Sequence, residues 1–84
     1  MIVILCDSYN DARMAFLTFL DFIQENGIII NEVYRHCLCV ETDDDLRYIF
    51  VDYRMEDQFK KMNPDIIWIG TFFEEIYQYF YLFN

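Results

Sequence analysis

The sequence predicts a small α/β domain with the element order β-α-β-β-α-β-α. Two wholly apolar runs, residues 2–6 and residues 66–69, indicate this class, because strands that lack a polar face are covered on both sides of a sheet. A stretch with helical spacing of apolar residues follows each run. We therefore expect one domain over residues 1–84, with the two strands as parallel neighbours in the middle of a reduced nucleotide-binding-type sheet. The alternative is a ferredoxin-like α+β sheet with an extra C-terminal helix.

A long helix is predicted directly after the first strand. Apolar residues recur at helical spacing from residue 11 to residue 26, on a face wide enough to be covered on more than one side. Ser8 or Asn10 is suited to cap the start of this helix, and Gly27 marks its end.

The middle of the chain predicts a hairpin. Residues 28–41 and 47–52 are rich in β-branched and apolar residues, and an acidic turn separates them. We expect the first of these segments to continue as one strand to Glu41, with Leu38 on one face and Cys37 and Cys39 on the other.

A short helix at 55–62 leads to the run at 66–69, which we expect to be the central strand. The turn Asn63-Pro64-Asp65 introduces this run and Gly70 ends it.

Charge restricts the function. The chain has 15 acidic and six basic residues, with a net charge of −9. This balance disfavours direct nucleic-acid binding and binding to anionic membranes, and it favours docking onto a basic protein surface. No apolar run approaches the roughly 18 residues of a membrane span, and the N-terminus lacks the basic region of a signal peptide. We expect a cytoplasmic protein, in a reducing compartment, of the host cell if the protein is viral.

Neither a metal nor a cofactor is predicted. The cysteines are Cys6, Cys37 and Cys39, an odd number, and with His36 they lack the usual zinc spacing, so we expect them to be reduced and metal-free. Asp7 and Asp52 follow strands at the edge where α/β sheets bind ligands, which leaves a small metal-dependent phosphoryl-transfer or nucleotide-binding domain as an alternative. Only two glycines are present, and no Gly-rich phosphate loop is formed.

Two segments carry a family resemblance: Asp7-Ser8-Tyr9-Asn10-Asp11-Ala12-Arg13 after the first strand, and Asn63-Pro64-Asp65-Ile66-Ile67-Trp68-Ile69-Gly70. With the hairpin between them, they resemble part of the P-loop ATPase domain of phage packaging terminases, over about 60 residues. In that family, a strand introduced by a Pro-Asp turn ends in the acidic Walker B pair. This chain has Gly70-Thr71 there and no Walker A motif. The resemblance implies a remnant fold that does not hydrolyse ATP, with a mobile-element origin.

The acidic residues give the leading functional hypothesis. Seven acids fall within residues 41–57, with only Arg47 and Arg54 as counter-charges: Glu41, Asp43, Asp44, Asp45, Asp52, Glu56 and Asp57. Such a surface can occupy a groove that a basic protein uses for nucleic acid. We expect a non-enzymatic phage or mobile-element protein, of the anti-CRISPR or DNA-mimic type, that binds and inhibits a nucleic-acid-handling host protein through these residues.

The C-terminal segment is predicted to be a helix that starts at Thr71. It carries more aromatic residues than one sheet face covers, and aromatic residues are enriched at interfaces. Phe73, Tyr77 and Tyr81 are therefore the candidates for a homodimer or partner interface, and a purely structural oligomer is the third alternative.

Overall fold

The computed structural model describes residues 1–69 of the chain. The strands are β1 (Ile2–Cys6), β2 (Ile30–Tyr34), β3 (Cys39–Thr42), β4 (Arg47–Asp52) and β5 (Ile66–Ile69), and the helices are α1 (Tyr9–Glu25) and α2 (Glu56–Lys60). Two short 3₁₀ turns, η1 (Arg35–Cys37) and η2 (Tyr53–Met55), follow β2 and β4. The predicted helix from Thr71 lies outside the described residues.

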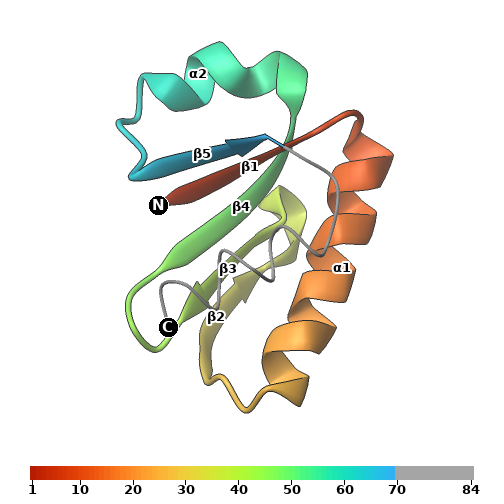
Figure 1. Cartoon of the computed structure of the whole chain (residues 1–84), viewed down its shortest axis with the longest axis vertical. Coiled ribbons are helices and arrows are strands. Elements are labelled where there is room, and N and C mark those ends of the chain that lie inside the picture. Colours follow the sequence, from red (N-terminus) through yellow and green to blue (C-terminus); the bar gives the residue numbers. More distant parts are fainter. Residues whose placement is uncertain (70–84) are drawn as a thin grey trace.

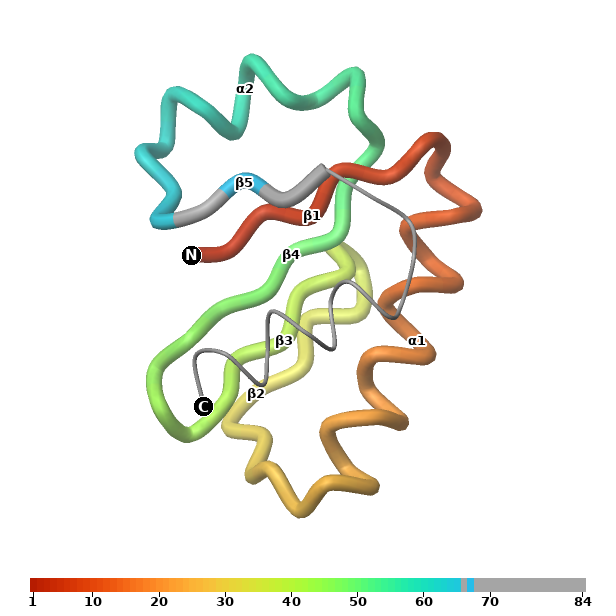
Figure 2. Tube along the Cα trace, in the orientation of Figure 1, coloured from red at the N-terminus to blue at the C-terminus, as the bar shows by residue number. Residues whose placement is uncertain are grey.

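The strands form one mixed sheet in the order β2-β3-β4-β1-β5 (Figures 1 and 2). β1 pairs in parallel with both β4 and β5, whereas β3 pairs antiparallel with both β2 and β4. The class is therefore α/β, and the prediction that residues 2–6 and 66–69 are parallel neighbours is confirmed. All five residues of β1 are buried, as an apolar run covered on both faces requires.

The expected central position of residues 66–69 is wrong. β5 is the last strand of the sheet among the described residues, and β1 holds the inner position between β4 and β5. The crossover from β4 through α2 passes β1 and places β5 on its far side (Figure 1). The Met1 carbonyl accepts a hydrogen bond from the Asp65 N–H at 2.9 Å, and the Met1 ammonium pairs with the Asp65 carboxylate at 2.6 Å, so the start of β5 is fixed beside the N-terminus.

Helix α1 begins two residues earlier than the apolar spacing predicts, and Ser8 is its N-cap. The Ser8 hydroxyl accepts a hydrogen bond from the Asp11 N–H at 3.1 Å, which satisfies one of the free amides of the first turn. At the other end Gly27 has a φ of +71°, and the N–H of Ile28 donates to the carbonyl of Ile23 at 2.9 Å. With the bond from the Gly27 N–H to the Gln24 carbonyl at 3.1 Å, this forms a Schellman end, for which glycine is the favoured residue.

The strand predicted over residues 28–41 is interrupted, and the expected alternation of its faces is wrong at that point. Residues 35–37 form the 3₁₀ turn η1, and Leu38 then adopts a left-handed conformation with a φ of 53°. This reversal turns the chain back as β3, so that β2 and β3 form a hairpin of their own. Leu38 is buried, and its carbonyl accepts the Phe50 N–H at 3.0 Å, so burial and pairing with β4 stabilise an unfavourable backbone conformation. The predicted helix at 55–62 is also shorter, since it consists of the end of η2 and α2.

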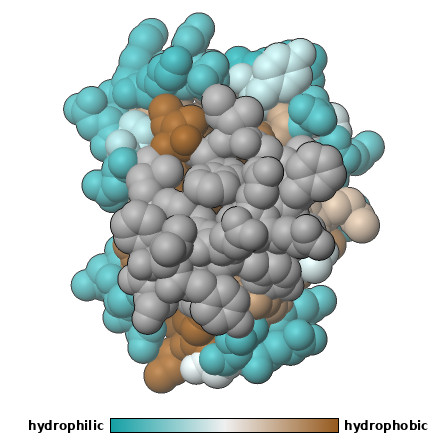
Figure 3. All heavy atoms as spheres, viewed as in Figure 1, coloured by the Kyte–Doolittle hydropathy of each residue, from teal (hydrophilic) through white to brown (hydrophobic). Residues whose placement is uncertain are grey.

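The core has two parts, one on each face of the sheet. Helix α1 packs on the face that presents Tyr48 and Phe50 of β4, and the ring centroids of Phe19 and Tyr48 lie 4.8 Å apart. The other face presents Val51 and packs against Phe59 of α2. Adjacent residues of β4 alternate between the two cores, as the pleat of a strand requires. Hydrophilic residues form most of the outline of the molecule in the view of Figure 3.

Candidate functional site

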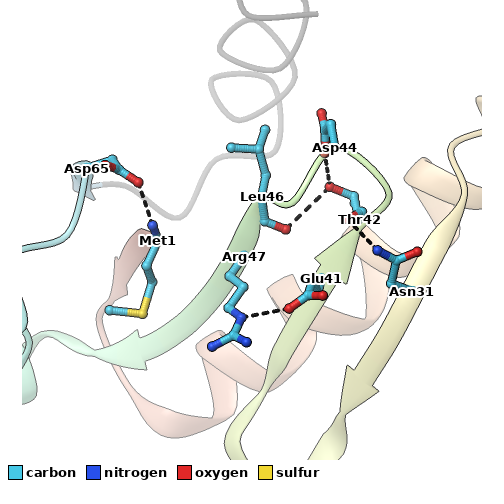
Figure 4. Close-up of polar contacts among 8 residues, drawn as sticks. All are labelled: Met1, Asn31, Glu41, Thr42, Asp44, Leu46, Arg47 and Asp65. Atoms are coloured by element: carbon cyan, nitrogen blue, oxygen red, sulfur yellow. Dashed lines mark hydrogen bonds and ion pairs between the residues drawn. The ribbon is translucent and has the colours of Figure 1, made fainter.

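The acidic turn (Asp43, Asp44 and Asp45) connects β3 to β4, and hydrogen bonds around Thr42 hold it (Figure 4). The Thr42 N–H donates to the Leu46 carbonyl at 2.9 Å, and the Asp45 N–H donates to the Thr42 carbonyl at 3.1 Å. The Thr42 hydroxyl, which is buried, donates to the Asp44 carboxylate. All three aspartates are exposed. The turn therefore presents three carboxylates from a hydrogen-bonded frame.

The acidic turn is also tied to β2. The Asn31 side-chain amide donates to the Thr42 carbonyl at 3.2 Å (Figure 4), and the Asp43 N–H donates to the Ile29 carbonyl at 3.0 Å. These bonds restrain the turn from Asn31 of β2 and from Ile29, which directly precedes that strand, so less conformational entropy remains to be lost when a partner binds.

Six of the seven predicted acids lie in two groups at opposite ends of β4. The acidic turn precedes β4, whereas Asp52, Glu56 and Asp57 lie at and beyond its carboxyl end. The length of β4 separates the two groups by roughly 17 Å, at about 3.3 Å per residue. Glu41 lies in β3, opposite Arg47 of β4.

Basic residues compensate some of these acids and not others. Glu41 pairs with Arg47 at 2.7 Å, Asp52 with Arg54 at 2.6 Å, and Glu56 with Lys60 at 3.4 Å; these three contacts are the side-chain ion pairs of residues 1–69. Hydrogen bonds from the Arg54 side chain and backbone N–H hold the pKa of Asp52 below its ordinary value. Within the described chain, no ion pair joins a member of the acidic turn to a basic group.

A pocket of about 370 Å³ lies at the carboxyl end of β4, between η1 and the segment formed by η2 and α2. We call it the carboxyl-end pocket, and the residues that line it are Tyr9, His36, Cys37, Leu38, Ile49, Phe50, Val51, Asp52, Met55 and Phe59. Of these lining residues, Asp52 alone belongs to the ligand site that the sequence predicts at this edge, together with Asp7. The other lining residues come from elements far apart in the chain. No sequence pattern identifies them as a group.

The carboxyl end of β1 is close to this pocket and is acidic. Cys6, the last residue of β1, lies in register with Asp52 of β4. Burial, and then the charges of Asp11, Asp7 and Asp52, raise the pKa of the Cys6 thiol to about 11. The thiol is therefore protonated at neutral pH. The structure thus places Asp7 and Asp52 at the same edge of the sheet, as the phosphoryl-transfer alternative requires, but no metal-ligating group of three or more His, Cys, Asp or Glu side chains occurs within the described residues.

The three cysteines are free thiols in different surroundings. Cys6 and Cys39 are buried, and burial raises the pKa of both. Cys37 is exposed in η1, where its thiol donates to the Tyr34 carbonyl at 3.6 Å. The expected common face for Cys37 and Cys39 is wrong, because Cys37 belongs to η1 and Cys39 begins β3 after the reversal at Leu38.

The other expected interface, Phe73, Tyr77 and Tyr81, lies outside the described residues, so a homodimer through these side chains stays a prediction. Neither helix of residues 1–69 has the length and apolar character needed to cross a membrane. No family model, curated protein or solved structure matches the chain.

Proposed function

We propose that this chain is a non-enzymatic acidic protein that binds and inhibits a basic, nucleic-acid-handling host protein. The acidic turn carries the proposal. It presents three exposed carboxylates on a hydrogen-bonded frame, without a basic partner in residues 1–69. Its charge is therefore available to lysine and arginine side chains that otherwise contact phosphates. A phage or mobile-element origin, and an activity of the anti-CRISPR or DNA-mimic type, are part of the proposal.

The distribution of ion pairs supports this assignment. Arg47, Arg54 and Lys60 each pair with an acid outside the acidic turn. Like charges crowded at one turn repel one another, at a cost of a few tenths of a kcal/mol per close pair. Contact with a basic partner would remove this repulsion, which is a physical reason for the turn to favour a bound state.

We also propose that the fold is a reduced nucleotide-binding-type sheet that has lost nucleotide chemistry. The parallel pairing of β1 with both neighbours supports this choice, because strands in a ferredoxin-like sheet pair antiparallel. In this proposal the chain resembles terminase ATPase domains because it is a remnant of such a domain and has no phosphate loop.

The test is a DNA-cleavage assay with a CRISPR nuclease and a restriction endonuclease, and a primer-extension assay with a DNA polymerase. We expect the wild-type chain to inhibit at least one of these enzymes, and added DNA and raised NaCl to relieve the inhibition. The variant D43N/D45N should weaken inhibition about tenfold at low salt, since it removes two of the three charges of the acidic turn. Asparagine is well tolerated at Asp45, where φ is 63°.

The matched control is D21N/E25Q, which removes two exposed acids from α1 and leaves the acidic turn intact. It should inhibit as the wild type does. Equal inhibition by D43N/D45N and the wild type would contradict the proposal, as would a failure to inhibit any enzyme of the panel.

A further inference from the structure

The carboxyl-end pocket is a second candidate contact surface, and the function proposed for the acidic turn does not account for it. We propose that it binds one bulky apolar side chain of a partner segment whose flanking residues are lysine or arginine. This inference rests on the proposed function and specifies the chemistry of the partner. Three observations lead to it: the apolar lining, the residues at the rim, and the charges beside the pocket.

The lining favours an apolar occupant. Leu38, Ile49, Val51 and Phe59 supply aliphatic and aromatic surface. The volume of about 370 Å³ is at the lower end of the range of ligand pockets. A space of this size suits a single tryptophan, phenylalanine or leucine side chain, and interface hot spots are commonly side chains that fill such pockets.

Two residues that line the pocket are large, apolar and exposed. Tyr9 is 57% exposed and Met55 is 38% exposed, and they come from α1 and η2 respectively. Tyrosine and methionine are enriched in protein interfaces, and the flexible methionine side chain adapts to different occupants. The rim therefore has the composition of a protein-binding surface.

The neighbouring charges select the flanking residues of the occupant. Asp7 directly follows β1, Asp52 lies in register with Cys6 at the end of that strand, and Asp11 lies in the first turn of α1. Within the described residues, Asp52 has an ion-pair partner and Asp7 and Asp11 have none. A phosphate or carboxylate ligand would meet repulsion here, whereas lysine or arginine beside an apolar anchor would meet attraction.

The pocket and the acidic turn lie at opposite ends of β4. A separation of roughly 17 Å along the strand is within the span of a standard interface, which buries about 800 Å² on each partner. One basic partner could therefore occupy both, with charge contacts at the turn and an anchor in the pocket.

The test uses a labelled synthetic peptide, acetyl-Lys-Arg-Trp-Lys-Arg-amide, and fluorescence anisotropy with the full chain. We expect replacement of its tryptophan by alanine to weaken binding at least about tenfold, because the anchor is lost. A peptide with the same tryptophan flanked by glutamates should show no binding. The protein variant M55K, which places a cation at the pocket, should weaken binding of the tryptophan peptide about tenfold.

The matched control is M62K, because Met62 is also exposed, does not line the pocket and acquires the same charge. It should change the affinity less than about twofold. Equal binding of the tryptophan and alanine peptides, or equal effects of M55K and M62K, would overturn the pocket inference, since binding would then reflect net charge alone. Tight binding of the glutamate-flanked peptide would contradict the inference that the partner segment has basic flanking residues.

The two proposals fail in different experiments. The variant D43N/D45N tests the acidic turn through enzyme inhibition, and M55K tests the pocket through peptide affinity. If M55K inhibits and binds as the wild type does, while D43N/D45N loses inhibition, the pocket inference falls and the proposed function stands. If D43N/D45N keeps full inhibition, the proposed function falls, whatever the peptide does.

Discussion

Single thiols illustrate how the fold sets chemical reactivity. Cys6 and Cys37 are the same residue type, but Cys6 is 1% exposed and its pKa is raised to about 11, whereas Cys37 is exposed in η1. The thiolate is the reactive form, so burial and nearby carboxylates both protect Cys6. The aspartates that we propose to face a basic partner thus also help to keep the neighbouring thiol protonated.

The residue-scale prediction is that a single thiol reacts rapidly with iodoacetamide at pH 8 in the folded protein. Peptide mass spectrometry should locate the label at Cys37, with Cys6 and Cys39 labelled only after unfolding in guanidinium. The variant C37S should lose the rapid phase. Rapid labelling of Cys6 in the native protein would contradict the burial that the structure assigns to it.

At the scale of elements, local sequence patterns predicted the helices and strands whose conformation depends mainly on their own residues. The spacing of apolar residues and Gly27 predicted α1 to within two residues, with Ser8 as one of two candidate caps, because capping and periodicity are local properties. The interruption at Leu38 was not predictable in this way. Leucine disfavours a positive φ, and only burial and the hydrogen bond from Phe50 show why it is accepted here.

The acidic turn allows a test at this scale, because Asp45 has a φ of 63° and Asp43 does not have a positive φ. A β-branched residue is strained in the left-handed region, so D45V should lower the free energy of unfolding by about 1–2 kcal/mol. D45N and D45G should be close to the wild type, since both residues tolerate this conformation. The control D43V removes the same charge without this strain. Urea denaturation measures all four variants, and equal losses for D45V and D43V would contradict the assigned turn.

At the scale of the whole molecule, the order of the strands in the sheet could be predicted only in part from the sequence. An apolar run such as residues 66–69 has the same composition at the last position of a sheet as in its middle, so the pairing of β5 with β1 was predictable and its position was not. The same applies to the carboxyl-end pocket. Its walls come from α1, η1, β4, η2 and α2, which only the tertiary fold brings together.

Net charge is the other property of the whole molecule. A charge of −9 on 84 residues produces self-repulsion in the compact state, and the ion pairs of Arg47, Arg54 and Lys60 offset only part of it. The basic members of those pairs are exposed and their acidic partners half-buried, so solvent already weakens the pairs and salt costs little by weakening them further. Screening of the repulsion should therefore change the free energy of unfolding more than weakening of the ion pairs does.

We accordingly expect the free energy of unfolding to rise by about 1 kcal/mol between 10 mM and 500 mM NaCl, as the screening length falls from about 30 Å to less than 5 Å. Urea denaturation at a series of NaCl concentrations measures this change. D43N/D45N should show a shallower dependence than the wild type, because it has two fewer negative charges to screen. D21N/E25Q loses the same number of charges, but from α1, where the spacing is wider than at the acidic turn. The salt dependence of its stability should lie between those of the wild type and D43N/D45N. A fall in stability with added NaCl would show that the ion pairs outweigh the repulsion.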